Sequence, residues 1–199
     1  MAAEKEKIGL FGGSFDPIHT GHLILAQAAA NVAGLSRVFF IPTAVPPNKR
    51  GVRLTGIETR TRMVKLAIAD NPLFELSRIE AVRGLSYTYR TVRSFVDQGY
   101  GKREIHLLIG SDSLEEIAGW RKPLEIFSHA TILVMMRQGH GRISELPAEA
   151  ALICMTAGSN SISSTEIRAL AGAGKSIRYL VHPAVEKFIT AHSLYGARA

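Results

Sequence analysis

The stretch "KIGLFGGSFDPIHTGHLILAQAAANVAGL", residues 7–35, decides the fold of this chain. Its first part, residues 7–11, is a short apolar run that is typical of a buried strand, and Gly12 and Gly13 end that run. Residues 21–35 are rich in Ala and Leu, which favour a helix. A strand that passes through a glycine-containing turn into a helix is typical of α/β proteins.

The same alternation of apolar runs and longer amphipathic segments continues along the chain. Further strands are predicted at 37–43, 74–77, 104–110, 130–136 and 151–155, and further helices at about 59–69, 87–100, 164–173 and 184–192. We therefore expect an α/β fold, a Rossmann-like doubly wound parallel sheet with helices on both faces. No internal repeat or long linker divides the chain, so we expect residues 1–199 to form a single domain, on which the C-terminal helices from about 164 also pack.

The composition favours a globular protein of a reducing compartment. Hydrophobic residues make up 46% of the 199 residues and charged residues 21%, which suits a packed core and argues against disorder. The one cysteine, Cys154, lies in an apolar run and is expected to be a buried thiol. No apolar segment has the length of a signal-peptide core or a membrane helix, so we expect a cytoplasmic location and no membrane partner. The sequence leaves the oligomeric state open, a homo-oligomer included.

The net charge of +7 raises the question of an anionic partner. The basic residues are scattered rather than gathered in one block, and few aromatic residues lie among them. They include Lys49, Arg50, Arg53, Arg60, Arg62, Arg90, Arg93 and Arg168. This pattern favours anionic small molecules over nucleic acid, and a basic nucleic-acid-binding protein is the alternative from a different functional class.

Candidate ligand-binding residues lie where the predicted strands end. Ligands of open parallel sheets bind at the carboxyl ends of the strands, where the strand order reverses. The strand ends to examine therefore lie near residues 11, 42, 110 and 155. After the first of these comes "GGSFDPIHTGH" (12–22), in which Gly12 and Gly13 allow a ligand to approach the backbone.

Two histidines in this segment point to phosphate binding. His19 and His22 are three residues apart, so at the start of a helix they share a face beside unpaired backbone N–H groups. Imidazoles and free amides together can bind and neutralise phosphate oxygens. The rival interpretation is a zinc site, for which the sequence offers no obvious third ligand and no H-E-x-x-H motif.

A second glycine-rich segment, "GAGKS" (172–176), resembles the end of a phosphate-binding P-loop but does not fit one. The full pattern requires a glycine where this chain has Ala169, and the segment follows a predicted helix rather than a strand. We interpret its glycines as a helix stop.

The sequence His19-Thr20-Gly21-His22 resembles the H-x-G-H signature of nucleotidyltransferases, which join a nucleotide α-phosphate to an acceptor. "SISSTEIR" (161–168) is similar to their second signature, a turn that enters a helix. Further matches resemble bacterial nicotinate mononucleotide adenylyltransferases over about residues 8–195. They are "PPNK" (46–49), "SYT" (86–88), "GSDSL" (110–114), Trp120 and "SIRYLVHPAV" (176–185). The chain departs from that family at Asn48, which replaces the usual histidine of "PPHK", and in "GSDSL", which is more often "GADSL".

The resemblance implies roles for individual residues. ATP would be bound by Gly12, Gly13, Ser14, His19, His22, Lys49, Asp112, Ser163, Ser164, Thr165 and Arg168. Of these, His22, His19 and Arg168 would be catalytic. Nicotinate mononucleotide would be bound by Tyr87, Thr88 and Trp120, whose indole face attracts a pyridinium cation. Mg²⁺ would be held by the substrate phosphates and water rather than by a metal site of the protein.

The reaction implied by the resemblance joins the AMP part of ATP to nicotinate mononucleotide. It would give nicotinate adenine dinucleotide and pyrophosphate, a step of NAD biosynthesis. The acceptor phosphate is already an anion, so the protein would need to align two anions and offset their charge rather than supply a strong base. The alternative acceptors are nicotinamide mononucleotide and phosphopantetheine.

Overall fold

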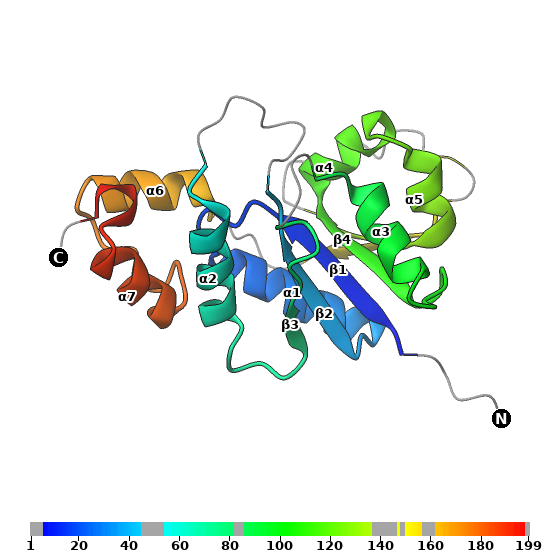
Figure 1. Cartoon of the computed structure of the whole chain (residues 1–199), viewed down its shortest axis with the longest axis horizontal. Coiled ribbons are helices and arrows are strands. Elements are labelled where there is room, and N and C mark those ends of the chain that lie inside the picture. Colours follow the sequence, from blue (N-terminus) through cyan, green and yellow to red (C-terminus); the bar gives the residue numbers. More distant parts are fainter. Residues whose placement is uncertain are drawn as a thin grey trace.

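The computed structural model describes residues 6–44, 54–81, 86–136, 147, 150–156 and 162–197. These residues contain a parallel sheet of six strands in the order β3-β2-β1-β4-β5-β6 (Figure 1). The strands are β1 (Ile8–Gly13), β2 (Arg37–Pro42), β3 (Phe74–Leu76), β4 (Ile105–Gly110), β5 (Thr131–Met136) and β6 (Leu152–Thr156). The order reverses between β1 and β4, which confirms the predicted doubly wound sheet.

Two hydrophobic cores lie on opposite faces of this sheet. In β1, Ile8 and Leu10 belong to one core and Phe11 to the other, and Leu107 and Leu108 of β4 divide in the same way. Both faces of the inner strands are therefore buried. This is why these strands are continuous apolar runs in the sequence rather than alternating ones.

Helices cover both cores, as the sequence predicts. Residues of α1 (Thr20–Ala33), α2 (Ile57–Ala67), α6 (Ser164–Gly172) and α7 (Pro183–Ala191) contribute to one core. Residues of α3 (Thr88–Val96), α4 (Ser111–Glu116), the 3₁₀ helix η2 (Ile117–Gly119) and α5 (Pro123–His129) contribute to the other. The predicted helices are present with ends shifted by a few residues, whereas α4 and α5 were not predicted.

Helix α1 approaches the sheet closely because its buried face is made mostly of alanine. Ala26 and Ala29 are fully buried, and Leu25 is buried beside them. The helix ends at Gly34, whose φ of 63° lies in the left-handed region and whose N–H donates to the carbonyl of Ala30. This close packing fixes the axis of α1, so the position of its first turn at the end of β1 is fixed as well.

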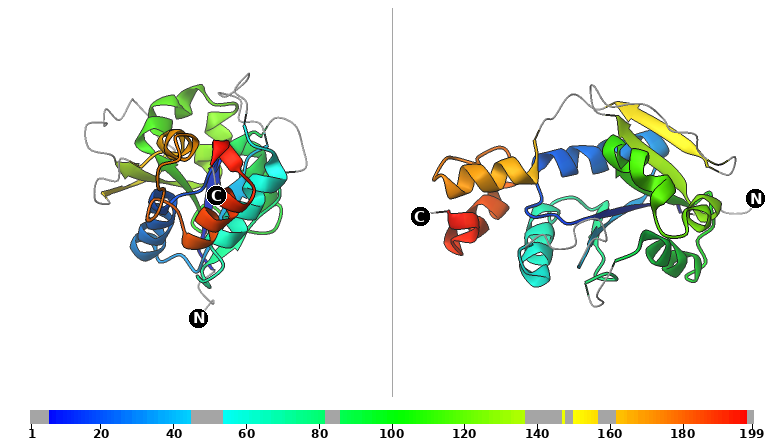
Figure 2. Two further views of the ribbon diagram at one scale, coloured as in Figure 1. Left: turned by 90° about the vertical axis from the view of Figure 1, so that its left-hand side faces the viewer. Right: turned by 90° about the horizontal axis from the view of Figure 1, so that it is seen from above.

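The C-terminal helices α6 and α7 lie past the carboxyl end of β1, as Figure 1 and the right-hand view of Figure 2 show. Helix α7 contacts α2, and the short 3₁₀ helix η3 (Leu194–Gly196) packs against α6 and α7. The last part of the chain is thereby brought back to the end of the sheet at which the first strand finishes.

One expectation about the core is wrong. Cys154 is exposed rather than buried. Its strand, β6, is the outermost strand on its side of the sheet, so one edge of that strand has no further strand beside it among the described residues. Across the described part of the chain, no helix is both long enough and apolar enough to span a membrane.

Candidate active site

Strands β1 and β4 are neighbours where the strand order reverses, and their pairing ends at Leu10 and Leu107, before either strand reaches its carboxyl end. Gly12 in β1 and Gly110 at the end of β4 would each direct an added Cβ atom into open space. Packing within the protein therefore gives no steric reason for glycine at these two positions. A ligand can approach the backbone there, at the place where open α/β sheets bind their ligands.

His19 and His22 flank the start of α1, directly after β1, and their ring centroids are 3.7 Å apart. The backbone N–H of His19 donates to Nδ1 of His22 at 3.2 Å. Because Nδ1 accepts this bond, the neutral His22 ring carries its proton on Nε2. Gly21 leaves room for the rings, since a Cβ atom there would lie 3.0 Å from Nδ1 of His19. His19 is buried and His22 is half-buried, so His22 is the more accessible of the two.

The first turn of α1 is held from two sides. Thr20 donates its backbone N–H and its hydroxyl to the carbonyl of Leu180, at 2.9 and 3.0 Å. On the other side, the rings of Phe15 and Phe11 have centroids 5.0 and 5.9 Å from that of His22. The sheet core and the C-terminal part of the chain therefore position the histidines together.

The second motif lies directly beside the first. Ser163 caps α6, and its side chain accepts a hydrogen bond from a backbone N–H of the first helical turn at 3.1 Å. The Ser164 hydroxyl donates to the carbonyl of Pro17 at 2.9 Å, and Nη1 of Arg168 donates to the carbonyl of Asp16 at 2.7 Å. The starts of two helices, far apart in the sequence, thus meet at the end of β1. Backbone N–H groups at such helix starts favour anions.

Arg60 of α2 lies beneath this site and is 1% exposed. Its guanidinium donates to four backbone carbonyls, those of Thr55 at 2.7 Å, Ser14 at 2.6 Å, Thr43 at 2.9 Å and Ala44 at 3.2 Å. These carbonyls belong to the loop after β1, the end of β2 and the segment before α2. Arg60 therefore joins three chain segments, and its charge is buried rather than exposed to an anionic partner.

Residues 10–170 match the cytidylyltransferase-like family. The chain belongs to that family. A relative from Caldicellulosiruptor saccharolyticus, named "Probable nicotinate-nucleotide adenylyltransferase", is 41% identical over 197 residues, which cover 95% of this chain and 98% of the relative. A protein of the same name from Pelobacter propionicus is 40% identical over 213 residues and covers 96% and 98% of the two chains.

Solved structures agree with this cytidylyltransferase-like fold. The nicotinic acid mononucleotide adenylyltransferase of Plasmodium falciparum complexed with NaAD superposes with a TM-score of 0.77 at 18% identity, and the match covers 96% of this chain and 98% of that one. The same protein complexed with APC superposes with a TM-score of 0.76. At this level of identity the comparison supports the fold.

On the other face of the sheet, this cytidylyltransferase-like chain brings together the residues expected to bind the acceptor. Tyr87 is the N-cap of α3, and Thr88 is the first helical residue. Trp120 follows η2 and is half-buried, packed against the core on this face. Its neighbour Arg121 has its Cζ atom 5.0 Å from the centroid of the Tyr87 ring. The Trp120 loop and the start of α3 are therefore adjacent.

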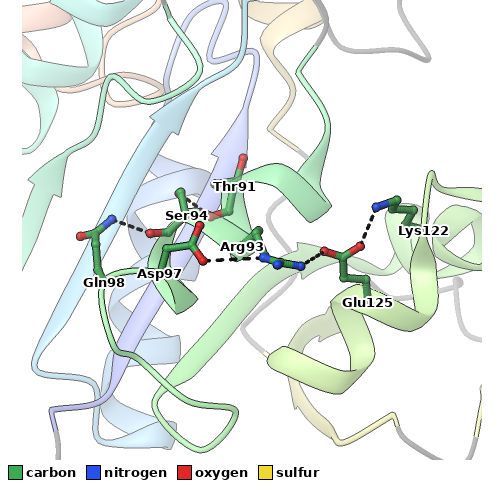
Figure 3. Close-up of polar contacts among 7 residues, drawn as sticks. All are labelled: Thr91, Arg93, Ser94, Asp97, Gln98, Lys122 and Glu125. Carbon is green, nitrogen blue, oxygen red and sulfur yellow. Dashed lines mark hydrogen bonds and ion pairs between the residues drawn. The ribbon is translucent and has the colours of Figure 1, made fainter.

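Ion pairs connect α3 with α5 and with Lys122, which lies two residues after Trp120 (Figure 3). Arg93 of α3 pairs with Asp97 on its own helix at 3.6 Å and with Glu125 of α5 at 3.1 Å. Glu125 also pairs with Lys122 at 3.0 Å. Lys122 precedes α5 in a left-handed conformation, with φ of 55°, and its ammonium lies 4.7 Å from the centroid of the Tyr89 ring. The Arg93 guanidinium thus forms ion pairs within the protein, while Arg121 and Lys122 lie beside tyrosine rings.

The remaining predicted site residues are placed as follows. Thr165 lies in the first turn of α6 and accepts a hydrogen bond from Nη2 of Arg168 at 3.2 Å. Asp112 lies in α4, directly after β4. Lys49 and Asn48 fall outside the described residues. Among the residues that the structure describes, no group of three or more His, Cys, Asp or Glu side chains could hold a metal ion.

Sequence reasoning missed the buried residues that support the site. Asp16 is 2% exposed and binds three other segments. Tyr195, near the end of the chain, donates to its carboxylate at 2.6 Å. The sequence gives little sign of these roles. Arg60 cannot be told from the exposed Arg62 two residues later, and Tyr195 belongs to no motif.

Proposed function

We propose that this protein is a nicotinate-nucleotide adenylyltransferase, which converts ATP and nicotinate mononucleotide into nicotinate adenine dinucleotide and pyrophosphate. The observation that carries the proposal is the meeting of the two motifs at the end of β1, through the Ser164–Pro17 and Arg168–Asp16 hydrogen bonds. The acceptor is supported by the relatives of that name, which are about 40% identical over nearly the full length.

The reaction is a direct transfer in line. An oxygen of the acceptor phosphate forms a bond to the α-phosphorus of ATP, while the bond from that phosphorus to the bridging oxygen of pyrophosphate breaks. The nucleophile carries its charge already, so the main requirement is to hold two anions close together and offset the charge that develops between them. In this proposal the His22 side chain, whose Nδ1 accepts from the backbone N–H of His19, donates from Nε2–H to an α-phosphate oxygen.

The other ATP contacts follow from the same geometry. Gly12 allows the nucleotide to approach β1, and the N-terminal turn of α6 supplies backbone N–H groups for the β- and γ-phosphates. The Arg168 guanidinium has more N–H donors than its two internal bonds use, so it can also hold a phosphate. Mg²⁺ enters as part of the Mg-ATP substrate, bound to its phosphates and to water.

We propose that the pyridine ring of the mononucleotide binds on the side of the sheet covered by α3 and α5, between the start of α3 and Trp120, while its phosphate reaches the carboxyl end of β1, where ATP binds. The backbone N–H groups of Thr88 and the following residues would receive the nicotinate carboxylate. The Trp120 indole would stack on the pyridinium ring. We further propose that the chain works as one domain, since residues of β1, α1, α6 and α7 share one core.

The experiment that tests the function is a pyrophosphate-release assay with Mg-ATP and a panel of acceptors. We expect the highest kcat/KM with nicotinate mononucleotide, a value at least about tenfold lower with nicotinamide mononucleotide, and no release with phosphopantetheine. A kcat/KM as high with either of the other acceptors would overturn the assignment of the acceptor. The absence of pyrophosphate release with every acceptor would overturn the enzyme assignment.

Replacement of Trp120 by Ala is expected to raise the KM for nicotinate mononucleotide by about 2- to 30-fold, which corresponds to the roughly 0.5–2 kcal/mol of a cation–π contact. The KM for ATP should change less than about twofold, because ATP binds at the other site. Steady-state kinetics with each substrate varied in turn measures both values. The control is Trp120→Phe, which keeps an aromatic face and should raise the KM for nicotinate mononucleotide by less than Trp120→Ala does. Equal changes in both KM values would mean that Trp120 serves packing alone.

A further inference from the structure

We propose that Tyr195, in the last turn of the chain, is a positioning residue that sets the orientation of Arg168 through Asp16. The inference rests on the proposed function, in which Arg168 holds a phosphate of ATP. It assigns a role in the active site to a tyrosine that belongs to neither sequence motif. The connection runs through two hydrogen bonds to different atoms of one buried residue.

Tyr195 occupies an unusual backbone position. Inside η3 its φ and ψ are 60° and 14°, in the left-handed region that side-chain-bearing residues adopt at a cost. Ser193 and Gly196 are also left-handed, with φ of 47° and 82°. This tight turn lets the tyrosine hydroxyl donate to Oδ1 of Asp16 at 2.6 Å. Burial, together with the Asp16 carboxylate, raises the pKa of Tyr195 far above its ordinary value, so the hydroxyl keeps the proton that it donates.

Asp16 connects the tyrosine to the site. Its Oδ1 accepts from Tyr195, its Oδ2 accepts from the backbone N–H of Thr55 at 3.0 Å, and its backbone carbonyl accepts from Nη1 of Arg168 at 2.7 Å. The side chain is therefore fixed from the C-terminal turn and from the segment before α2. Because the carbonyl belongs to the same residue, the two side-chain bonds restrain the Asp16 backbone, and a shift of that backbone would move the acceptor that orients the Arg168 guanidinium.

Packing alone does not account for the hydroxyl of Tyr195. The backbone of Tyr195 lies close to α6, since a Cβ atom on Gly172 would be 3.0 Å from the Tyr195 carbonyl oxygen. Phenylalanine would keep that backbone contact and the ring, and would lose the hydroxyl with its bond to Asp16 and its 4.0 Å contact with the Met63 sulfur. The replacement Tyr195→Phe therefore separates positioning from packing.

Kinetics of Tyr195→Phe provides the first test. We expect kcat/KM for ATP to fall about tenfold, because a hydrogen bond to a buried carboxylate is lost, while the KM for nicotinate mononucleotide stays within about twofold. The matched control is Tyr179→Phe, since Tyr179 is also left-handed, with φ of 67°, but is 85% exposed. That control should match the wild type. The inference would be overturned if kcat/KM for ATP in Tyr195→Phe equalled the wild-type value. It would also be overturned if the KM values for ATP and for nicotinate mononucleotide rose by the same factor.

A double-mutant cycle with Arg168→Ala provides the second test. If Tyr195 acts through Arg168, the tyrosine replacement should cost less than about twofold once Arg168 is absent. A full tenfold loss in that background would overturn the inference. Where turnover is too slow to measure, the dissociation constant for ATP is compared across the same four proteins. Circular dichroism checks that each variant is folded. The cycle is measured with the acceptor that gives pyrophosphate release in the wild type. If the wild type does not use nicotinate mononucleotide, the proposed function fails, and this result is separate from a failure of the coupling between Tyr195 and Arg168.

Discussion

Replacement of His22 by Ala is expected to lower kcat by about 10²–10³-fold, the loss found when one preorganised donor to a developing charge is removed. The KM for ATP should change little, since many other groups bind the nucleotide. In the proposed mechanism the ring has two separate tasks: Nδ1 accepts from the backbone N–H of His19, and Nε2–H donates to an α-phosphate oxygen. Steady-state pyrophosphate release measures the loss.

Two further variants separate these tasks of His22. Asparagine can place its oxygen where Nδ1 accepts from His19, but it has no donor at the position of Nε2. We therefore expect His22→Asn to fold normally and to lose nearly as much kcat as His22→Ala. The control is His192→Ala, at an exposed histidine whose Nδ1 lies 3.0 Å from the carbonyl of Phe188 on α7. Near-normal turnover in His22→Asn would show that His22 only caps the helix.

Replacement of Arg60 by Met is expected to lower the free energy of unfolding by about 3–5 kcal/mol, as for other buried charges that lose a partner. Four backbone carbonyls would lose their donor, and the buried Asp16 carboxylate would lose a nearby positive charge. Burial lowers the pKa of the Arg60 guanidinium and Asp16 opposes that shift, so the two charges stabilise one another. Urea unfolding of the full chain measures the difference.

Arg62→Met is the matched control for this experiment. Arg62 lies on the same helix and is exposed, so its replacement should change stability by no more than about 0.5 kcal/mol. Arg60→Lys keeps the charge but cannot reach all four carbonyls with one ammonium, so we expect an intermediate loss. If Arg60→Met were as stable as Arg62→Met, the network beneath the site would not contribute to stability.

The strands could be predicted because burial on both faces produces a simple pattern. The runs at β4 and β5 are continuously apolar, and both strands lie inside the sheet. The pattern cannot show which strand lies at an edge. Cys154 therefore seemed buried, although β6 is outermost in the observed order.

Helices α4 and α5 were missed because each is short and its sequence is polar around a few apolar residues. Two signals were available. Pro123 stands at the first position of α5, where proline is favoured, and a connection between parallel strands such as β4 and β5 requires a crossover. The topology, rather than local propensity, would have predicted a helix there.

The meeting of the two motifs that we propose to bind phosphate could be expected from the sequence, because each motif is compact and lies at the start of a helix. The support beneath it could not, because Arg60 binds backbone carbonyls and Asp16 is held by Tyr195 from the other end of the chain. Every residue has a backbone carbonyl, so the sequence does not show which carbonyls accept hydrogen bonds from a buried side chain. Such partners become visible only when the fold brings the segments together.

The central claim is that the acceptor phosphate itself attacks the α-phosphorus of ATP, with no covalent intermediate on the protein. The stereochemistry at that phosphorus tests this claim most directly. With ATP that carries a chiral thiophosphate at the α position and nicotinate mononucleotide as acceptor, a single in-line displacement inverts the configuration at phosphorus in the dinucleotide product. We expect inversion; retention would mean two displacements through a nucleotidylated side chain and would contradict a direct transfer.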